Sequence, residues 1–277
     1  YDAVNHALSA VATGGFSTKN DSIAYFDSAT IETVISLFMI IGSLPITFYI
    51  ILLRNHEIEP FRFGQAKQFL QTVLLLVLLI ALWLSLKNDV PFLTSLRWSS
   101  FNIISVITTT GFASTDFLSW GIWTAVFFSL LSLHGGCIGS TTGSVKTMRW
   151  QVLFSYIHKV IASAVNPNRV VPVKVGDVPV ADKVVISVLV YILLFFITIA
   201  ICAISLNFMG YDFTTSLSAA IASITNTGPG IATEIGIAGN YAFFSPLAKL
   251  LLCAAMMFGR LEILTLLVIF TPSFWKN

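Results

Sequence analysis

The stretch Ser105-Val-Ile-Thr-Thr-Thr-Gly-Phe-Ala-Ser114 occurs in this chain in three related forms. The other two are Ser9-Ala-Val-Ala-Thr-Gly-Gly-Phe-Ser-Thr18 and Ala222-Ser-Ile-Thr-Asn-Thr-Gly-Pro-Gly-Ile231. Aligning Gly15, Gly111 and Gly228 places a Thr or Asn two residues before each glycine and a Phe or Pro directly after it. Repeats spaced by roughly one hundred residues indicate duplicated structural units.

A short apolar segment precedes each of these stretches, at Ala3–Ala12, Trp98–Thr108 and Thr214–Thr225. A helix of about ten residues is about 15 Å long, which is half the thickness of a membrane. Each segment then meets a polar Thr/Gly turn. This pattern predicts re-entrant elements, which enter the membrane and leave on the same side.

The turns predict a cation filter made of backbone carbonyls. A dehydrated cation needs several oxygen ligands, and a loop supplies them without burying a formal charge. Glycine permits the positive φ values that turn successive carbonyls toward one axis, and the short helices direct their negative C-terminal ends at the ion. The alternative is that these are tight packing turns with local threonine hydrogen bonds. The predicted filter residues are Thr13, Gly14, Gly15, Thr109, Thr110, Gly111, Asn226, Thr227 and Gly228.

The composition is that of an integral membrane protein. Of 277 residues, 56% are hydrophobic and 10% charged, with a mean hydropathy of +0.87. A net charge of +2 is too small for a nucleic-acid partner, so the expected surroundings are membrane lipid. The three cysteines are expected to be free thiols, and no His/Cys spacing resembles a metal site. The expected spans are 30–53, 69–86, 120–133, 148–164, 184–206 and 244–270.

Basic residues predict the orientation of the chain. Nine lie in the connections that carry no short helix, and four lie in those that do. The first group is therefore expected in the cytoplasm, which makes this a multi-pass protein of the cell inner (cytoplasmic) membrane with its filter facing outward. The cytoplasmic group is Arg54, Arg62, Lys67, Lys146, Arg149, Lys159, Arg169, Lys174 and Lys183; the outer group is Lys19, Lys87, Arg97 and Lys249.

A run of small residues interrupts the apolar segment Ser119–Lys159. Four glycines and three hydroxyl residues in nine positions are incompatible with a stable helix interior. Broken helices at membrane depth line transport pathways, so we interpret the run as a mobile gate beneath the filter, with a close helix-packing kink as the alternative. The predicted gate residues are Gly135, Gly136, Gly139, Ser140, Thr141, Thr142 and Gly143.

Arg260 lies deep in the last apolar segment and is assigned to the same gate. A guanidinium at the bilayer centre costs at least ~2.5–3.5 kcal/mol on insertion scales, so it is expected to face the bundle interior. There it would raise the barrier to cations. A structural ion pair or a carbonyl-bonded arginine is the alternative. Glu262, two positions on, is on a different helix face and is not the expected partner.

These motifs resemble those of the Trk/Ktr/HKT superfamily of potassium transporters. The resemblance rests on Ala12–Thr18, Thr108–Phe112, Asn226–Gly230, Gly135–Gly143, Gly259–Glu262 and Phe270–Lys276, and it runs from end to end. It implies an all-α integral-membrane fold of repeated helix, re-entrant pore loop, helix units around a pseudo-fourfold pore. It also implies that potassium is the transported ion, that the inner loop and Arg260 act as the gate, and that no cofactor is bound covalently.

The resemblance divides the chain into three units. Residues 1–66 form the second repeat without its preceding span, 67–182 the third repeat with the broken inner helix, and 183–277 the fourth. We therefore expect a fragment whose N-terminal part is absent or supplied separately, and we do not expect this chain alone to conduct. The implied partners are a second copy in a homodimer and a cytosolic nucleotide-binding regulatory ring (TrkA-like). The basic stretch Lys159–Lys183 is the expected docking surface, although positive-inside topology alone also explains it.

Potassium uptake through a channel-like pore is the leading hypothesis. A secondary transporter with a midplane site also uses repeats and broken helices, but repeats that all enter from one side favour a pore. The sequence offers no nucleophile beside a base, no paired carboxylates and no set of metal ligands, so we do not expect an enzyme. Passive flux and symport with protons or sodium both remain open from the sequence.

Overall fold

The computed structural model describes residues 1–277 except 56–63, 122, 177, 233, 237–238, 262, 270 and 276–277. Of the residues discussed above, Arg62, Glu262, Phe270 and Lys276 lie outside the described part. The helices are α1 Asp2–Val11, α2 Ala29–Ser43, α3 Ile46–Asn55, α4 Gly64–Lys87, α5 Phe92–Ile107, α6 Thr124–Ser132, α7 Thr147–Val165, α8 Asp182–Phe208, α9 Phe213–Thr225, α10 Pro246–Arg260 and α11 Ile263–Ile269. Short 3₁₀ turns occur at Ser22–Phe26, Phe117–Trp120 and Pro272–Trp275, and two short strands, β1 Lys174–Val175 and β2 Val178–Pro179, form an antiparallel hairpin. The all-α fold is confirmed.

The three predicted short helices are confirmed as α1, α5 and α9. Asp212 begins α9 by accepting hydrogen bonds from the backbone N–H groups of Thr214 and Thr215. Hydrogen bonds from Thr215 and then Thr214 lower the pKa of the Asp212 carboxyl, which keeps it charged at the positive end of the helix. The helix α5 has 16 residues and begins earlier than predicted, because Pro91 at its N-cap suits a helix start.

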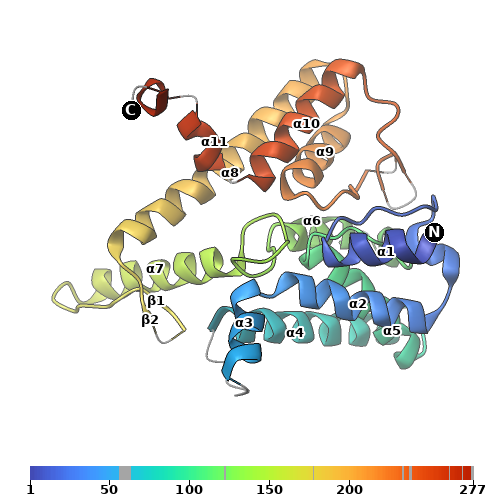
Figure 1. Cartoon of the computed structure of the whole chain (residues 1–277), viewed down its shortest axis with the longest axis horizontal. Helices are drawn as coiled ribbons and strands as arrows, with labels where there is room; N and C mark the ends of the chain where they lie inside the picture. The colour runs from blue at the N-terminus through green and yellow to red at the C-terminus, as the bar shows by residue number, and fades with distance from the viewer. Residues whose placement is uncertain are drawn as a thin grey trace.

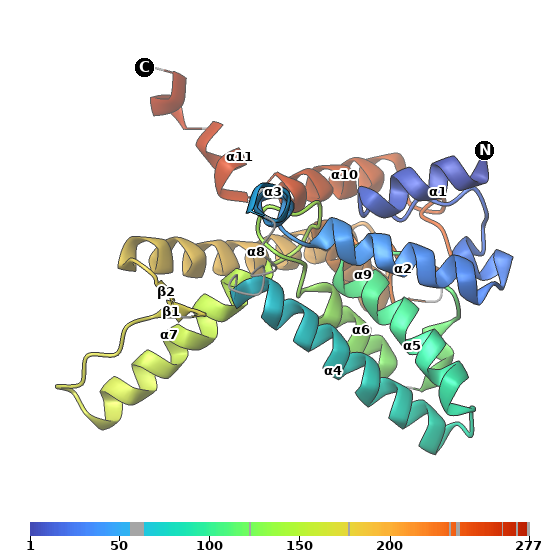
Figure 2. The same ribbon diagram turned by 60° about the horizontal axis from the view of Figure 1, so that its bottom comes forward.

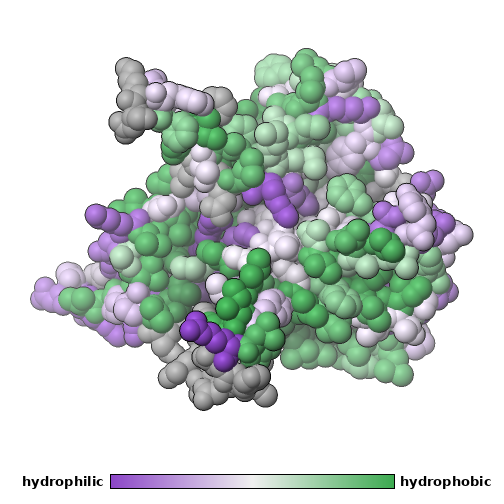
Figure 3. Space-filling model, viewed as in Figure 1, coloured by the Kyte–Doolittle hydropathy of each residue, from purple (hydrophilic) through white to green (hydrophobic). Residues whose placement is uncertain are grey.

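Two predicted spans are confirmed as single long helices, α4 and α8. Both are long and apolar enough to cross a membrane, and only 33% of the most apolar window of each is buried. Their outer faces expose residues such as Leu74, Ile186 and Leu193. Figure 3 shows apolar side chains over much of one face of the molecule, with hydrophilic side chains gathered near its middle. Such a surface is suited to lipid tails.

Three predicted spans are not continuous. The span 30–53 is wrong as a single helix, because α2 and α3 meet at 90° around Leu44 and Pro45, where proline lacks a backbone donor. The span 120–133 is wrong in length, since α6 has nine residues and a 3₁₀ turn and Gly121 precede it. The span 244–270 ends as α10 at Arg260 and resumes as α11. The segment 148–164 is a helix, α7, as predicted, but α7 is not among the described helices that are long and apolar enough to cross a membrane.

The helices pack as two neighbouring groups (Figure 1). In one, α4 runs along α5, and α1 and α5 lie against α2; in the other, α8 runs along α9 and α10. Each group has its own apolar core, with α6 touching both α5 and α9. The helix α7 and the hairpin project together from one side, where Ser155 Oγ accepts a hydrogen bond from the backbone N–H of Lys174. This hairpin lies inside the basic stretch 159–183 and was not predicted.

A buried ion pair joins α2 to α5. The Arg97 guanidinium donates to both carboxylate oxygens of Glu32, at 2.7 and 2.9 Å, and the Glu32 side chain is 4% exposed. Asp27 makes a third, exposed contact at 3.0 Å. Because Arg97 belongs to α5 and Glu32 to the helix that follows the first predicted turn, the pair fixes one predicted unit against the next.

Candidate ion-binding site

The three predicted filter turns share one backbone conformation. Gly15, Gly111 and Gly228 have φ values of +70°, +86° and +95°. The residue two positions earlier also has positive φ in every turn: Thr13 at +50°, Thr109 at +55° and Asn226 at +58°. Left-handed geometry is uncommon outside glycine, so its recurrence at the same offset shows that the aligned segments are conformational repeats.

The hydrogen bonds that hold each turn to its short helix also repeat. The residue before each glycine, namely Gly14, Thr110 and Thr227, donates from its backbone N–H to a carbonyl five positions earlier, at 2.8–3.1 Å. The residue before that, namely Thr13, Thr109 and Asn226, donates to a carbonyl three positions earlier. The packing-turn alternative predicted threonine side-chain bonds, and some exist, such as Thr108 Oγ1 to Thr110 Oγ1 at 2.7 Å. The turn itself, however, is formed by the backbone.

The carbonyl groups of these turns are largely without partners. In the described part of the chain, no hydrogen bond reaches the carbonyl oxygens of residues 13–15, 109–111, 226 or 227. Buried or half-buried backbone carbonyls nearly always find a donor in folded proteins. Eight such oxygens, at corresponding positions of the three turns, therefore accept no hydrogen bond among the described residues.

The turns lie against one another in chain order. A methyl group on Gly15 would overlap the carbonyl oxygen of Thr110, and one on Gly111 would overlap that of Thr227. A methyl group on Gly228 would meet nothing within 4 Å. The structure thus brings the three glycines together through backbone contact, and a side chain is excluded at the first two positions.

A cavity of about 670 Å³ separates the first turn from the third. Thr13 and Gly14 line it on one side and Asn226, Thr227 and Gly228 on the other. Side chains of α10 also line this cavity, among them the exposed side chain of Arg260 at the end of the helix. No group of three or more His, Cys, Asp or Glu side chains is found among the described residues. The lining of this cavity offers backbone carbonyls, hydroxyl groups and the side-chain amide of Asn226.

The predicted gate run forms the connection between α6 and α7, as the glycine content required. Figure 2 shows this loop at the centre of the molecule, near the α2–α3 bend and the end of α10. Gly135 and Gly136 begin it, and their carbonyl oxygens accept from the side chain and backbone of Thr147, the first residue of α7. The break is therefore a closed, hydrogen-bonded loop.

The loop contacts the inner ends of all three turns. Thr141 Oγ1 lies 3.2 Å from Thr13 Oγ1 and within donating distance of the Val11 carbonyl oxygen, at 3.2 Å, where α1 ends. The backbone N–H of Gly143 donates to Thr109 Oγ1 at 2.8 Å. A methyl group on Gly143 would lie 2.5 Å from the Thr225 carbonyl oxygen, at the end of α9.

The same loop is bonded to the α2–α3 bend. Cys137 N and Thr141 N donate to the carbonyl oxygens of Ser43 and Gly42, at 3.0 and 3.1 Å, and Ile46 N donates to the Gly139 carbonyl at 3.0 Å. The bend frees these groups, because a helix that stops at Ser43 leaves its last carbonyls without intrahelical partners.

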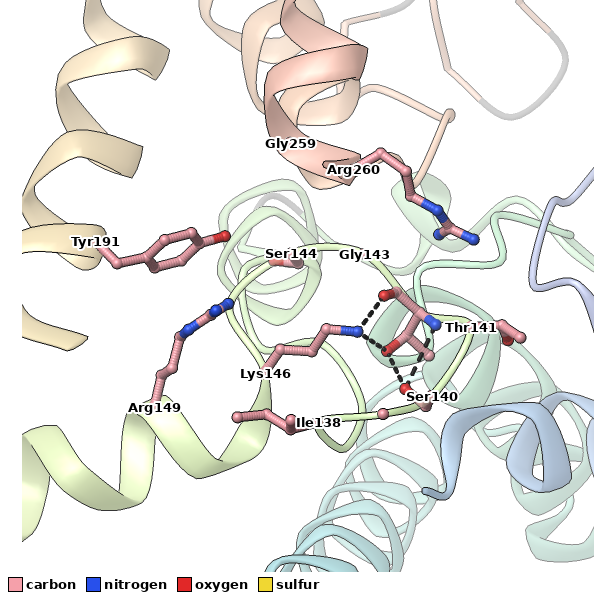
Figure 4. A pocket seen from close by; sticks show the side chains of 12 residues that line it. Ile138, Ser140, Thr141, Gly143, Ser144, Lys146, Arg149, Tyr191, Gly259 and Arg260 are labelled. Carbon is pink, nitrogen blue, oxygen red and sulfur yellow. Dashed lines mark hydrogen bonds between the residues drawn. The ribbon is translucent and has the colours of Figure 1, made fainter. Parts of the chain in front are cut away.

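Three cationic side chains lie beside the loop, away from its contacts with the turns (Figure 4). A cavity of about 240 Å³ is lined by Ser140, Thr142, Lys146, Arg149 and Arg260, among others. Lys146 Nζ donates to the Thr142 carbonyl at 2.5 Å, and the Arg149 guanidinium lies 3.7 Å from the centre of the Tyr191 ring. Arg260 was predicted at this loop, whereas Lys146 and Arg149 were used only to predict the orientation of the chain. Their position directly after the run 135–143 is the sequence signal that could have placed them beside the loop.

Arg260 ends α10, and Gly259 beside it packs so closely on the Ile224 carbonyl that a methyl group would overlap it. Arg260 lines both cavities, the one beside the turns and the one beside the loop. Its predicted proximity to the loop is thus observed.

Comparison with known proteins gives one consistent match. The family model for TrkH, described as a cation transport protein, matches residues 1–277. The Trk system potassium uptake protein TrkI of Halomonas elongata is 40% identical over all of this chain and 56% of its own length, and TrkH of Salmonella typhimurium is 32% identical over all of this chain and 57% of its own. The crystal structure of the potassium transporter TrkH from Vibrio parahaemolyticus matches with a TM-score of 0.92 at 30% identity, over 99% of this chain and 59% of that one. The chain thus spans a little over half the length of these relatives.

Proposed function

Because this chain belongs to the TrkH family of cation transport proteins, we propose that it forms part of a potassium uptake pathway across the cytoplasmic membrane. The relatives compared above carry the names of potassium uptake proteins and not of enzymes. The single observation that supports the proposal most is the set of eight carbonyl oxygens without a hydrogen-bond donor, at corresponding positions of three turns.

Those oxygens are suited to replace the water around potassium. An ion that enters the membrane must exchange its hydration shell for other oxygens, and carbonyl dipoles provide them without a formal charge. The helices α1, α5 and α9 end immediately before the turns, so their negative ends add a favourable field for a cation. We assign the filter role to Thr13–Gly15, Thr109–Gly111 and Asn226–Gly228.

The loop 135–143 is the proposed gate. Through Thr141 and Gly143 it contacts the turns, and each hydrogen bond that holds it there is individually weak, at about 0.5–1.5 kcal/mol net. Displacement of the loop would open the inner side of the filter. Arg260 would add an electrostatic barrier on the same path.

The assembly follows from the same proposal. Residues 1–66, 67–182 and 183–277 would be three successive units around one pore, with the filter side facing outward. The hairpin β1–β2 and the basic residues around it would receive a cytosolic nucleotide-binding ring, and a second copy would complete a homodimer. Each of these is a proposal about the whole transporter.

Rubidium uptake in a host that lacks its own potassium transport tests the filter. Gly111→Ser in the full-length protein should abolish uptake, because any side chain at φ +86° overlaps the Thr227 carbonyl. The matched control is Gly210→Ser, at φ +96° with no atom within 4 Å of the new Cβ, which should retain uptake. Parent-level uptake by Gly111→Ser at equal membrane abundance would refute the filter assignment.

Three helix breaks, α2–α3, α6–α7 and α10–α11, favour one second candidate, a secondary transporter with a midplane site. A pore and a secondary transporter differ in whether potassium flux is coupled to a second ion gradient. A transporter of that class would show flux that requires a proton or sodium gradient, whereas a pore would carry potassium down its own gradient when both are collapsed.

A further inference from the structure

One carbonyl of the three turns differs from the rest. The Gly228 oxygen accepts a hydrogen bond from the Tyr241 hydroxyl at 2.7 Å. Within the described residues, the equivalent oxygens of Gly15 and Gly111 accept none. The third turn therefore ends in a carbonyl whose direction a side chain controls.

Tyr241 is held in place by its own surroundings. Its ring stacks on Phe244, with centroids 5.7 Å apart and planes at 23°, and Phe244 is 2% exposed. Tyr211 packs on the same phenylalanine, with ring centroids 4.7 Å apart. Lys249 Nζ donates to the carbonyl oxygen of the next residue, Ala242, at 2.9 Å. These contacts fix both the ring and the backbone that carry the hydroxyl.

The hydroxyl is a donor at neutral pH. Burial raises the pKa of Tyr241 above its ordinary value, because the phenolate would lose hydration. The group thus stays protonated, and a carbonyl accepts from it with one lone pair while the second remains for another partner.

Gly15 and Gly111 each lie against the backbone of the following turn. Among the described residues of this chain, no backbone confines Gly228 in that way, and the contact of its carbonyl oxygen is the one with Tyr241. At φ +95° a glycine is free to rotate its peptide group unless something holds it. Here the Tyr241 hydroxyl holds the carbonyl oxygen, and the Gly228 N–H donates to the Ala222 carbonyl at 3.5 Å.

We propose that Tyr241 is a positioning residue for ion discrimination, whose hydroxyl restrains the Gly228 carbonyl so that this turn cannot contract around a smaller cation. The inference rests on the proposed potassium uptake function. Sodium requires shorter oxygen distances than potassium, and a carbonyl that is held by a hydrogen bond follows the ion inward less readily than a carbonyl without one.

The test is the ratio of potassium to sodium uptake by the full-length protein in the transport-deficient host. Tyr241→Phe removes one oxygen and keeps the ring, and it should lower the ratio by about five-fold, the equivalent of one ordinary hydrogen bond. Total uptake at saturating potassium should change less than the ratio, because the change affects the choice between ions more than the passage of either.

The matched control is Tyr211→Phe, which removes a hydroxyl from the same aromatic cluster. That hydroxyl accepts from the backbone N–H of Ser245 and touches no filter carbonyl. The ratio should stay at the parent value. Should Tyr241→Phe not accumulate in membranes, Tyr241→Leu is scored in the same way.

The outcomes separate cleanly. A parent-level ratio in the Tyr241 variant overturns the inference and leaves potassium uptake standing. An equal fall in the Tyr211 variant also overturns it, since the cause would then be loosened packing. A parent protein without potassium uptake above the host background refutes the proposed function itself, and the inference with it.

Discussion

Gly143→Ala tests whether the loop 135–143 closes the pathway. Gly143 sits where the loop meets the second and third turns, with its N–H bonded to Thr109 Oγ1 at 2.8 Å. An alanine Cβ would lie 2.5 Å from the Thr225 carbonyl oxygen and 3.2 Å from Asn226 Cβ. Both obstacles belong to the short helix α9 and its turn, so neither moves aside as a flexible side chain would.

The magnitude follows from that overlap. Inserting a methyl group into a tightly packed site costs typically about 1–3 kcal/mol. If the loop leaves this position when it opens, the cost falls on the closed state alone. An equilibrium biased by that amount shifts by roughly five- to 150-fold toward the open state. Steady potassium flux should rise, up to the limit set by the filter.

The assay is rubidium uptake and single-channel current of the reconstituted full-length protein, at equal protein amounts. The control is Ile138→Ala, which removes atoms from the same loop without adding any at the turns. It should leave the flux within about two-fold of the parent, because Ile138 is half-buried and the substitution creates no overlap with the turns. Flux that is unchanged or lower in Gly143→Ala, with the selectivity of the parent, would refute the gate assignment.

Two further perturbations address the rest of the molecule. Arg97→Met should destabilise the detergent-solubilised protein by about 3–5 kcal/mol, because it leaves the buried Glu32 carboxylate uncompensated. Asp27→Asn should cost no more than about 1 kcal/mol, since Asp27 is 90% exposed; equal losses of thermal stability in both variants would contradict the clamp. Arg260→Ala should raise potassium flux several-fold, and Arg260→Lys should keep the parent flux; a fall or no change in the alanine variant would rule out a barrier at this position.

The sequence was sufficient for features that depend on local chemistry. Glycine and threonine at a repeated offset predicted three turns, and the positive φ values at Gly15, Gly111 and Gly228 follow from residue type. The interruption of the helix at 135–143 was predicted for the same reason, since four glycines cannot sustain helical structure. The long apolar runs predicted α4 and α8.

Features that depend on contacts between residues distant in sequence could not be predicted. The bend at Pro45 was missed because membrane helices often tolerate proline, and the hydrogen bonds from the loop at 137–141 that stabilise the bend come from a part of the chain distant in sequence. The short α6 was predicted too long for a similar reason: the apolar run continues through residues that the fold places in turns. The contact between Tyr241 and Gly228 spans an irregular loop that carries no periodic signal.

The three backbone bonds between the loop and the α2–α3 bend have a mechanical consequence. The loop bonds to Gly42 and Ser43 before Pro45 and to Ile46 after it, so it is hydrogen-bonded to both helices of the bend. Displacing the loop without moving α3 would break all three hydrogen bonds, whereas a joint movement keeps them. Motion of the loop is therefore expected to change the orientation of α3, and a partner that moves α3 would in turn displace the loop.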